Sequence, residues 1–155
     1  MKDSTKINLK IPPPIVTLVF SGLMYVLDWF YGFKISSSSL NWLIVFLLSI
    51  ACFLLFPAVA QFYKNKTTVN PLKPETSKVL VTGGVYYYSR NPMYLGMALV
   101  LLAWGVFLGN PFNIILFIGF IVYMNELQIK LEEKALATIF GDEFKKYKNN
   151  VRRWI

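Results

Sequence analysis

Residues 92–129 read PMYLGMALVLLAWGVFLGNPFNIILFIGFIVYMNELQI, and this stretch decides the fold. Two apolar runs, 92–108 and 111–129, flank a Gly-Asn-Pro sequence at 109–111 that is typical of a tight turn. A helix needs roughly 20 apolar residues to cross a bilayer. The second run meets that length and the first is slightly shorter, so the stretch predicts an antiparallel pair of membrane helices.

Two further apolar runs precede this pair. One covers 11–33 and begins with prolines at 12–14, where their missing N–H groups cost a helix least. The other covers 40–63. The 155 residues are 55% hydrophobic and 15% charged, whereas a soluble domain carries about 25% charged residues. We therefore expect one all-α membrane domain over residues 1–155. Its roughly four transmembrane helices are expected at about 12–33, 40–63, 92–109 and 111–130.

The basic residues predict how the chain is oriented. The net charge is +8, and of the 16 Lys and Arg residues only Lys34 lies outside the two tails and the loop after the second span. Because cytosolic segments carry the excess of Lys and Arg, both termini and that loop are predicted to be cytosolic. We expect an integral membrane protein in contact with membrane lipids. Neither a nucleic-acid partner nor an obligate protein partner is expected.

The chain is expected to stay helical beyond the fourth span. Apolar residues recur there at helical spacing until Gly141, which is expected to end the first of two helices. A short second helix then carries a cationic face, and Trp154 beyond it suits the lipid headgroup layer. The sequence thus predicts cytosolic, amphipathic C-terminal helices at about 131–150.

Composition also excludes several kinds of chemistry. The chain contains no His, which rules out His-ligated metals and His acid–base catalysis. Its single cysteine, Cys52, lies in an apolar run and is expected to be inert packing. No nucleophile with a base, metal site or phosphate-binding loop is recognisable, so no metal is expected.

The first cluster that could carry chemistry is 81–94, VTGGVYYYSRNPMY, where the cytosolic loop enters the third span. Two glycines permit a close backbone approach, the tyrosines supply aromatic faces, and Arg90 is a cation that can bind two oxygens at once. Pro92 begins a helix whose free N–H groups point back at the loop. An ordinary membrane interface, which is also enriched in Tyr and Arg, remains the alternative.

The second cluster holds Glu126, Glu132 and Glu133, at the cytosolic end of the fourth span. Acids near a bilayer are costly and often functional, although a solvated helix start remains the alternative here. Adjacent residues on a helix point about 100° apart, so only one of Glu132 and Glu133 can easily face a given site. Asn125 lies close by and is an equally open candidate.

Four blocks in this order resemble the isoprenylcysteine carboxyl methyltransferases and the related phospholipid methyltransferases. They are LVTGGVY at 80–86, RNPMY at 90–94, Glu132-Glu133, and FGDEFKKY at 140–147. The opening IPPP at 11–14 and TVNPL at 68–72 resemble small bacterial members, which implies a location in the bacterial inner membrane. Prenylcysteine enzymes usually carry His where Asn91 stands, which weakens assignment to a prenylcysteine substrate.

The resemblance implies S-adenosylmethionine as cofactor, bound in a cytosolic pocket between the last two spans and the C-terminal helices. The residues it places at the cofactor are Leu80, Val81, Tyr86, Asn91, Pro92, Met93, Tyr94 and Glu132. Gln128 is expected to face the acceptor, with Asn125 beside it. Arg90 is expected to pair either with the cofactor carboxylate or with Glu133, and Glu133 is the expected base for an amine acceptor.

The expected function is therefore methyl transfer to a lipid-like or hydrophobic acceptor, a carboxylate or an amine, that arrives from the lipid phase. Two alternatives stand beside it. One is a membrane sterol-type reductase using NADPH, which shares a similar Arg–x–Pro–x–Tyr motif. The other is a small helical membrane protein without enzymatic activity.

Overall fold

The computed structural model describes residues 11–32, 35, 38–65 and 79–155. Within these residues the chain forms helices and no strand, as expected. The helices are α1 (Pro13–Tyr31), α2 (Ser38–Lys64), the 3-10 turn η2 (Gly84–Tyr87), α3 (Pro92–Leu108), α4 (Asn113–Tyr123), the π-helical turn η3 (Met124–Ile129) and α5 (Lys130–Asn150). The lysines of the N-terminal tail, Lys34 and residues 66–78 of the loop after the second span lie outside the described residues.

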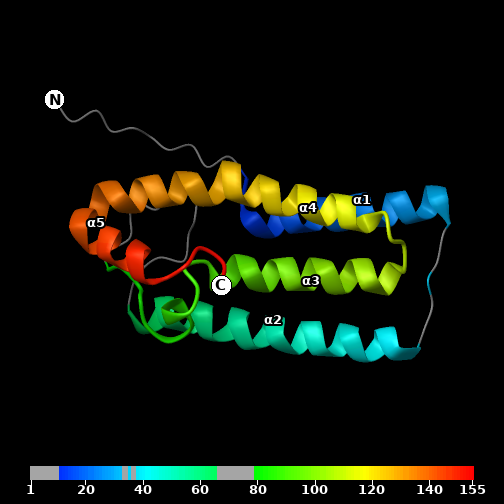
Figure 1. The fold of residues 1–155 in the computed structure, drawn as a ribbon, viewed down its shortest axis with the longest axis horizontal. Coiled ribbons are helices and arrows are strands. Elements are labelled where there is room, and N and C mark those ends of the chain that lie inside the picture. The colour runs from blue at the N-terminus through cyan, green and yellow to red at the C-terminus, as the bar shows by residue number, and fades with distance from the viewer. Residues whose placement is uncertain (1–10, 33–34, 36–37, 66–78) are drawn as a thin grey trace.

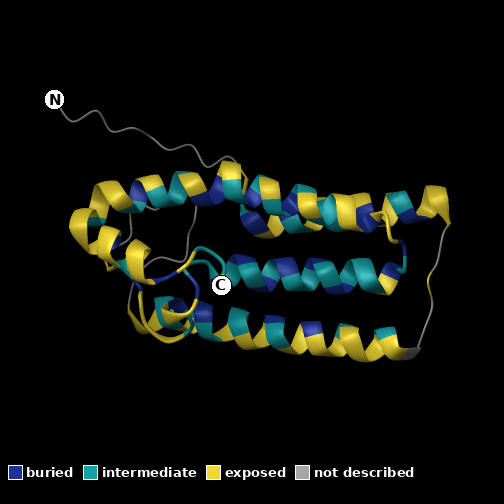
Figure 2. Ribbon diagram, in the orientation of Figure 1, coloured by how far each residue is buried: buried dark blue, intermediate teal, exposed yellow. Residues whose placement is uncertain are grey.

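Helix α3 occupies the centre of the molecule (Figure 1), where it packs against α1, α2 and α4. Its buried residues Tyr94, Ala98 and Leu101 join Phe120 and Met124 of the neighbouring α4–η3 helix in the main core. The outer faces of α1, α2 and α4 are largely exposed in Figure 2, and many of their exposed side chains are apolar. Such faces suit a lipid environment rather than water.

Three helices are long and apolar enough to cross a membrane, and α3 is a shorter apolar helix of 17 residues. These lengths and compositions confirm the expected fold class, an all-α membrane protein with four main helices. The helix that starts at Asn113 is longer than a bilayer requires. From Lys130 onward it carries Glu132, Glu133 and Lys134, so α5 lies outside the apolar part of the bundle.

Small residues let α2 and α3 approach closely. Ala51 and Ala58 of α2 are fully buried, and a Cβ atom added to Gly96 of α3 would lie 2.6 Å from Cγ of Leu55. In lipid the hydrophobic effect does not drive helices together, so such close packing is a main source of their association. A larger side chain at position 96 would therefore require α2 to move.

The expected tight turn joins α3 to α4. Gly109 has φ 72°, a left-handed conformation that favours glycine, and its N–H donates to the carbonyls of Gly105 and Val106. Its own carbonyl accepts from the N–H of Ile35 over 2.8 Å, which ties the turn to the α1–α2 connection. The turn confirms the antiparallel hairpin predicted from 92–129.

The helix after this turn bends where the sequence predicted. Helices α4, η3 and α5 run on without a break until Gly141, whose φ of 52° and ψ of −121° are not helical. Figure 1 shows the chain doubling back at this point, so that its last residues return to the start of α3. The bend therefore brings the C-terminal residues against the hairpin.

We expect Gly96→Val to lower the free energy of unfolding by about 1–3 kcal/mol, because the added methyl groups overlap Leu55 and the backbone of Ala51. Thermal unfolding in detergent, or denaturant unfolding, measures the change. Gly105→Ala is the matched control, because its Cβ atom would have no neighbour closer than 3.6 Å. Equal destabilisation by both substitutions would contradict close α2–α3 packing at Gly96.

Candidate functional site

Three side chains meet at the end of the hairpin that lies away from its turn: Tyr94, Gln128 and Glu132. We call them the acid cluster. The hydroxyl of Tyr94 donates to Oε1 of Glu132 over 2.5 Å, and Nε2 of Gln128 donates to the same oxygen over 2.6 Å. Tyr94 lies in the first turn of α3 and Glu132 in the first turn of α5. The hairpin therefore brings together residues that are 38 positions apart in the chain.

The π-helical turn η3 controls which side chains face this cluster. Met124, Gln128 and Ile129 are buried within it, whereas Glu126 and Leu127 are exposed. A π turn adds a residue to one turn of a helix and shifts the angular position of everything that follows, and such turns often occur at functional sites. The sequence pattern predicted a continuous helix here and did not reveal this turn.

The carboxyl of Glu132 is held in an environment that favours its neutral form. Burial raises its pKa from the usual 4.5 to about 7, although the hydrogen bonds from Tyr94 and Gln128 oppose the rise. Both of those hydrogen bonds reach Oε1, and Oε2 accepts none from the residues described. Glu132 thus combines a free oxygen with a proton that is exchangeable near neutral pH.

Glu133 lies beside Glu132 in the sequence but has the opposite environment. Arg153 binds both of its oxygens, through Nε at 3.0 Å and Nη2 at 2.8 Å, and Arg90 Nη2 lies 3.0 Å from Oε1. Lys148 is a weaker partner at 3.5 Å. Burial alone favours the neutral acid, but the hydrogen bonds and charges of these basic groups outweigh it and lower the pKa of Glu133.

Residues 147–154, which we call the C-terminal strap, lie across the loop before α3. The Tyr147 hydroxyl donates to the carbonyl of Tyr86 over 2.6 Å, and Nη1 of Arg90 donates to the carbonyl of Lys148. Farther along, the Arg90 N–H and the Asn91 side-chain amide donate to the carbonyls of Arg152 and Arg153 respectively. The strap therefore closes one side of the site with backbone contacts.

Trp154 completes this closure. Its indole packs against the main core, and its Nε1 donates to Oδ1 of Asn125 over 3.0 Å. Asn125, a candidate acceptor-binding residue, thus holds the strap, whereas Gln128 joins the acid cluster. The strap partners Tyr147, Arg153 and Trp154 were not expected at the site, because no local pattern links residues so far apart in the chain.

The loop residues expected at the cofactor form a second wall. Val81 and Tyr86 are buried against Ala58 of α2, with Met93 packed against the same group. Leu80 is half-buried just before them. The structure therefore gathers the expected cofactor residues between α2, the first turn of α3 and the first turn of α5.

Two features near the start of α3 suit an anionic group. The Arg90 side chain is only 8% exposed, and its Nε atom has no hydrogen-bond partner among the described residues. No side chain caps the first turn of α3, where Pro92 is the first residue and the following N–H groups have no partner within the helix. Unpaired donors at a helix start attract carboxylate or phosphate.

A cationic hollow of about 650 Å³ lies inside the bend of α5. Glu133 and Arg153 form part of its wall, so it adjoins the ion pairs of Glu133. The other charged residues that line it are Lys130, Lys134, Asp142, Lys145 and Lys148. Basic side chains outnumber acidic ones there, which suits anionic groups at a membrane surface.

The fold and this site define a class of protein: a helical membrane protein with an acid, a buried cation and a free helix start at one end of a hairpin. The profile of the phospholipid methyltransferase family matches residues 41–143, about two thirds of the sequence. The chain belongs to this family, which confirms the resemblance drawn from its four sequence blocks.

Individual relatives agree with this assignment. An uncharacterized protein of Haemophilus influenzae is 48% identical over 63 residues, which are 41% of this chain and all of that protein. The protein-S-isoprenylcysteine O-methyltransferase of Saccharomyces cerevisiae is 38% identical over 51% of this chain and 33% of its own length. The enzyme of the same name from Dictyostelium discoideum is 27% identical over 88% and 57% respectively.

The chain thus spans between a third and somewhat over half of these two named enzymes. No solved structure gives a significant match.

We expect Arg153→Met to lower the free energy of unfolding by about 2 kcal/mol, because it leaves the Glu133 carboxylate without its two-point partner. Glu133→Gln should cost a similar amount, and the double variant less than the sum of the two. A double-mutant cycle from denaturant unfolding measures the coupling. Additive losses would contradict a direct interaction, and Arg152→Met, which changes an exposed neighbour, is the control.

Proposed function

We propose that the protein transfers a methyl group from S-adenosylmethionine to a lipid-like or hydrophobic acceptor at the cytosolic face of the membrane. Family membership supports a membrane methyltransferase. The observation that carries the finer proposal is the acid cluster. It offers a partly buried carboxylate with one free oxygen, beside a free helix start, at the end of a hairpin embedded in lipid.

The residues present fit the chemical groups of this cofactor. Its amino-acid carboxylate would find the unpartnered Nε of Arg90 and the N–H groups at the start of α3. The free oxygen of Glu132 would accept a hydrogen bond from a ribose hydroxyl or from the ammonium group. We expect the cationic sulfonium to lie near the ring of Tyr94, whose π face would stabilise it.

When bound, S-adenosylmethionine would supply an electrophilic methyl group for in-line transfer to the lone pair of the acceptor, and the neutral thioether would leave. Alignment and exclusion of water are then the protein's main contributions. The strap and the core packing of Trp154 cover the site on one side. We expect a lipid acceptor to reach the site from the lipid phase, between the apolar helices.

An amine acceptor also has to lose a proton, and Glu132 suits this role better than Glu133. With a pKa raised to about 7 by burial, Glu132 can take up a proton at neutral pH. Glu133 is held by Arg153 and Arg90, which lower its pKa and occupy both of its oxygens. We therefore propose Glu132 as the base, in place of the expected Glu133. Glu133 and Arg90 instead support the strap.

Binding of S-adenosylmethionine to the protein in nanodiscs, measured by calorimetry, tests the proposal directly. We expect Glu132→Gln and Tyr94→Phe each to weaken binding about tenfold, the equivalent of one lost hydrogen bond in this setting. Glu126→Gln is the matched control, because Glu126 is an exposed acid paired with Lys130 on the same helix. Wild-type protein that does not bind the cofactor at physiological concentrations would refute the proposal.

The dependence of the rate on pH distinguishes the two acceptor classes. With an amine-bearing lipid the rate should rise as pH increases through about 7, because Glu132 accepts a proton only once it is ionised. Glu132→Gln should remove this rise while Glu126→Gln keeps it. A carboxylate acceptor needs no base, so at saturating S-adenosylmethionine its rate should show no such step. Transfer of labelled methyl to each lipid, measured from pH 5.5 to 8.5, gives the profiles.

A further inference from the structure

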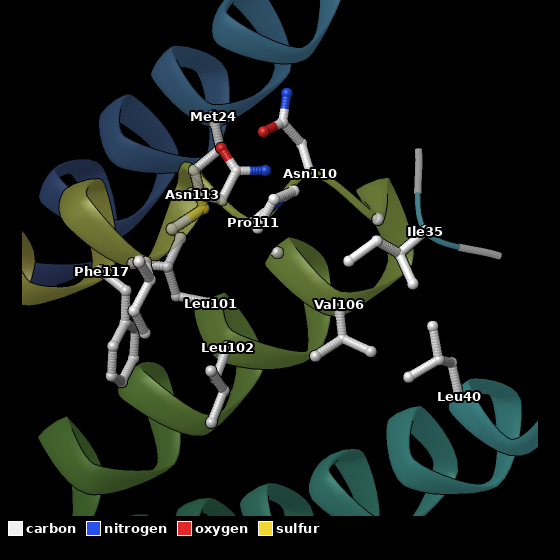
Figure 3. A pocket seen from close by; sticks show the side chains of 13 residues that line it. Met24, Ile35, Leu40, Leu101, Leu102, Val106, Asn110, Pro111, Asn113 and Phe117 are labelled. Carbon is white, nitrogen blue, oxygen red and sulfur yellow. The ribbon is translucent and has the colours of Figure 1, made fainter. Parts of the chain in front are cut away.

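A second cavity lies at the opposite end of the hairpin (Figure 3). It has a volume of about 210 Å³ and lies between α1, the end of α3 and the start of α4, beside the first residues of α2. Met24, Leu101, Val106 and Phe117 form much of its apolar wall. Helix α3 runs from the acid cluster to this cavity, and its 17 residues span about 25 Å, so the two sites are separate.

Of the described residues that line this cavity, two buried amides are the only ones with polar side chains. Asn113 is 3% exposed, and neither its Oδ1 nor its Nδ2 has a partner among the residues that the structure describes. Asn110 is 2% exposed; its Oδ1 accepts from the N–H of Phe112, but its Nδ2 is likewise unpartnered. Figure 3 shows both amides beside the apolar side chains of the wall.

Burying these unpaired amide groups costs free energy of folding unless something else occupies the cavity and pairs with them. Buried polar atoms are nearly always hydrogen-bonded, and an unpaired amide in an apolar environment is unfavourable. A leucine at position 113 would have similar size and would suit the surrounding wall better. The amides therefore point to a ligand that supplies the missing hydrogen bonds.

We propose that this cavity binds an uncharged amphiphile from the lipid phase, with a compact apolar body and one group that both donates and accepts hydrogen bonds. A primary amide or an alcohol meets both requirements, because Asn113 offers a donor and an acceptor together. Among the described residues no charged side chain lines the cavity, so a charged ligand would find no partner of opposite charge among them. An apolar cavity of about 150 Å³ binds benzene, so this one accommodates a ring with a small polar group.

Benzamide and ethylbenzene, which are similar in size, serve as probes for the wild-type protein in nanodiscs. We expect benzamide to raise the thermal unfolding temperature and to shift the side-chain amide NMR signals of Asn113. Ethylbenzene should bind at least about tenfold more weakly, because it makes neither hydrogen bond. S-adenosylmethionine binding should be unaffected by either probe, since the sites lie at opposite ends of α3.

Two variants keep the test independent of folding defects. Asn113→Leu should raise the unfolding temperature without probe and abolish the preference for benzamide. Gly105→Leu should fill the cavity and prevent binding, because a Cβ atom there meets only ordinary contacts, with Asn113 and Met24. The exposed Asn149→Leu is the control and should bind benzamide like the wild type.

Three outcomes would overturn the proposal. If neither probe binds the wild type, the amides are satisfied by water alone. If ethylbenzene binds as well as benzamide, the cavity is merely apolar. If benzamide binds Asn113→Leu as tightly as the wild type, the amide of Asn113 does not recognise it.

Discussion

Glu133 joins three separate stretches of the chain, and the arrangement of the site depends on its ion pairs. Its carboxylate is only 11% exposed, and it meets Arg90 from the loop before α3 and Arg153 from the C-terminal strap. A carboxylate so nearly buried is stable only when opposite charges and hydrogen bonds compensate for the lost water. Because these partners come from different segments, satisfying one charge also positions the loop, α5 and the strap together.

Glu132 and Glu133 are consecutive residues in one turn of α5, yet their side chains lie in different chemical environments. Glu132 faces Tyr94 and Gln128, two neutral donors in a buried setting, and its pKa rises to about 7. Glu133 faces basic groups, and its pKa falls. The expectation that only one of the two faces a given site is confirmed, because successive side chains project about 100° apart. One acid remains available for chemistry while the other stabilises the fold around it.

The two ends of the central hairpin present different chemical groups. At the start of α3, charged groups and a free helix end meet, which suits a polar, charged molecule from the aqueous side. At the end of α3, two neutral amides stand in an apolar wall, which suits an uncharged molecule from the lipid. Between them α3 packs closely against its neighbours through small residues such as Gly96 and Ala98.

The sequence by itself determined the helices, the turn at 109–111, the bend at Gly141 and the residue blocks that the site contains. These features depend on local properties: the length of apolar runs and the conformations that Gly and Pro favour. Most of the residues proposed from those blocks do lie at one end of the hairpin, including Tyr94, Glu132 and Arg90.

Only the tertiary structure decided which acid meets which partner, that the C-terminal strap closes the site, and that two amides share an apolar cavity. The π turn at 124–129 shifts the helix phase, so angles extrapolated from the sequence cannot say which side chain faces α3. The strap contacts join residues about 60 positions apart, as the pair Tyr147–Tyr86 shows, and no local pattern encodes them. Burial and partners set the properties of these groups, and both arise only when distant segments pack together.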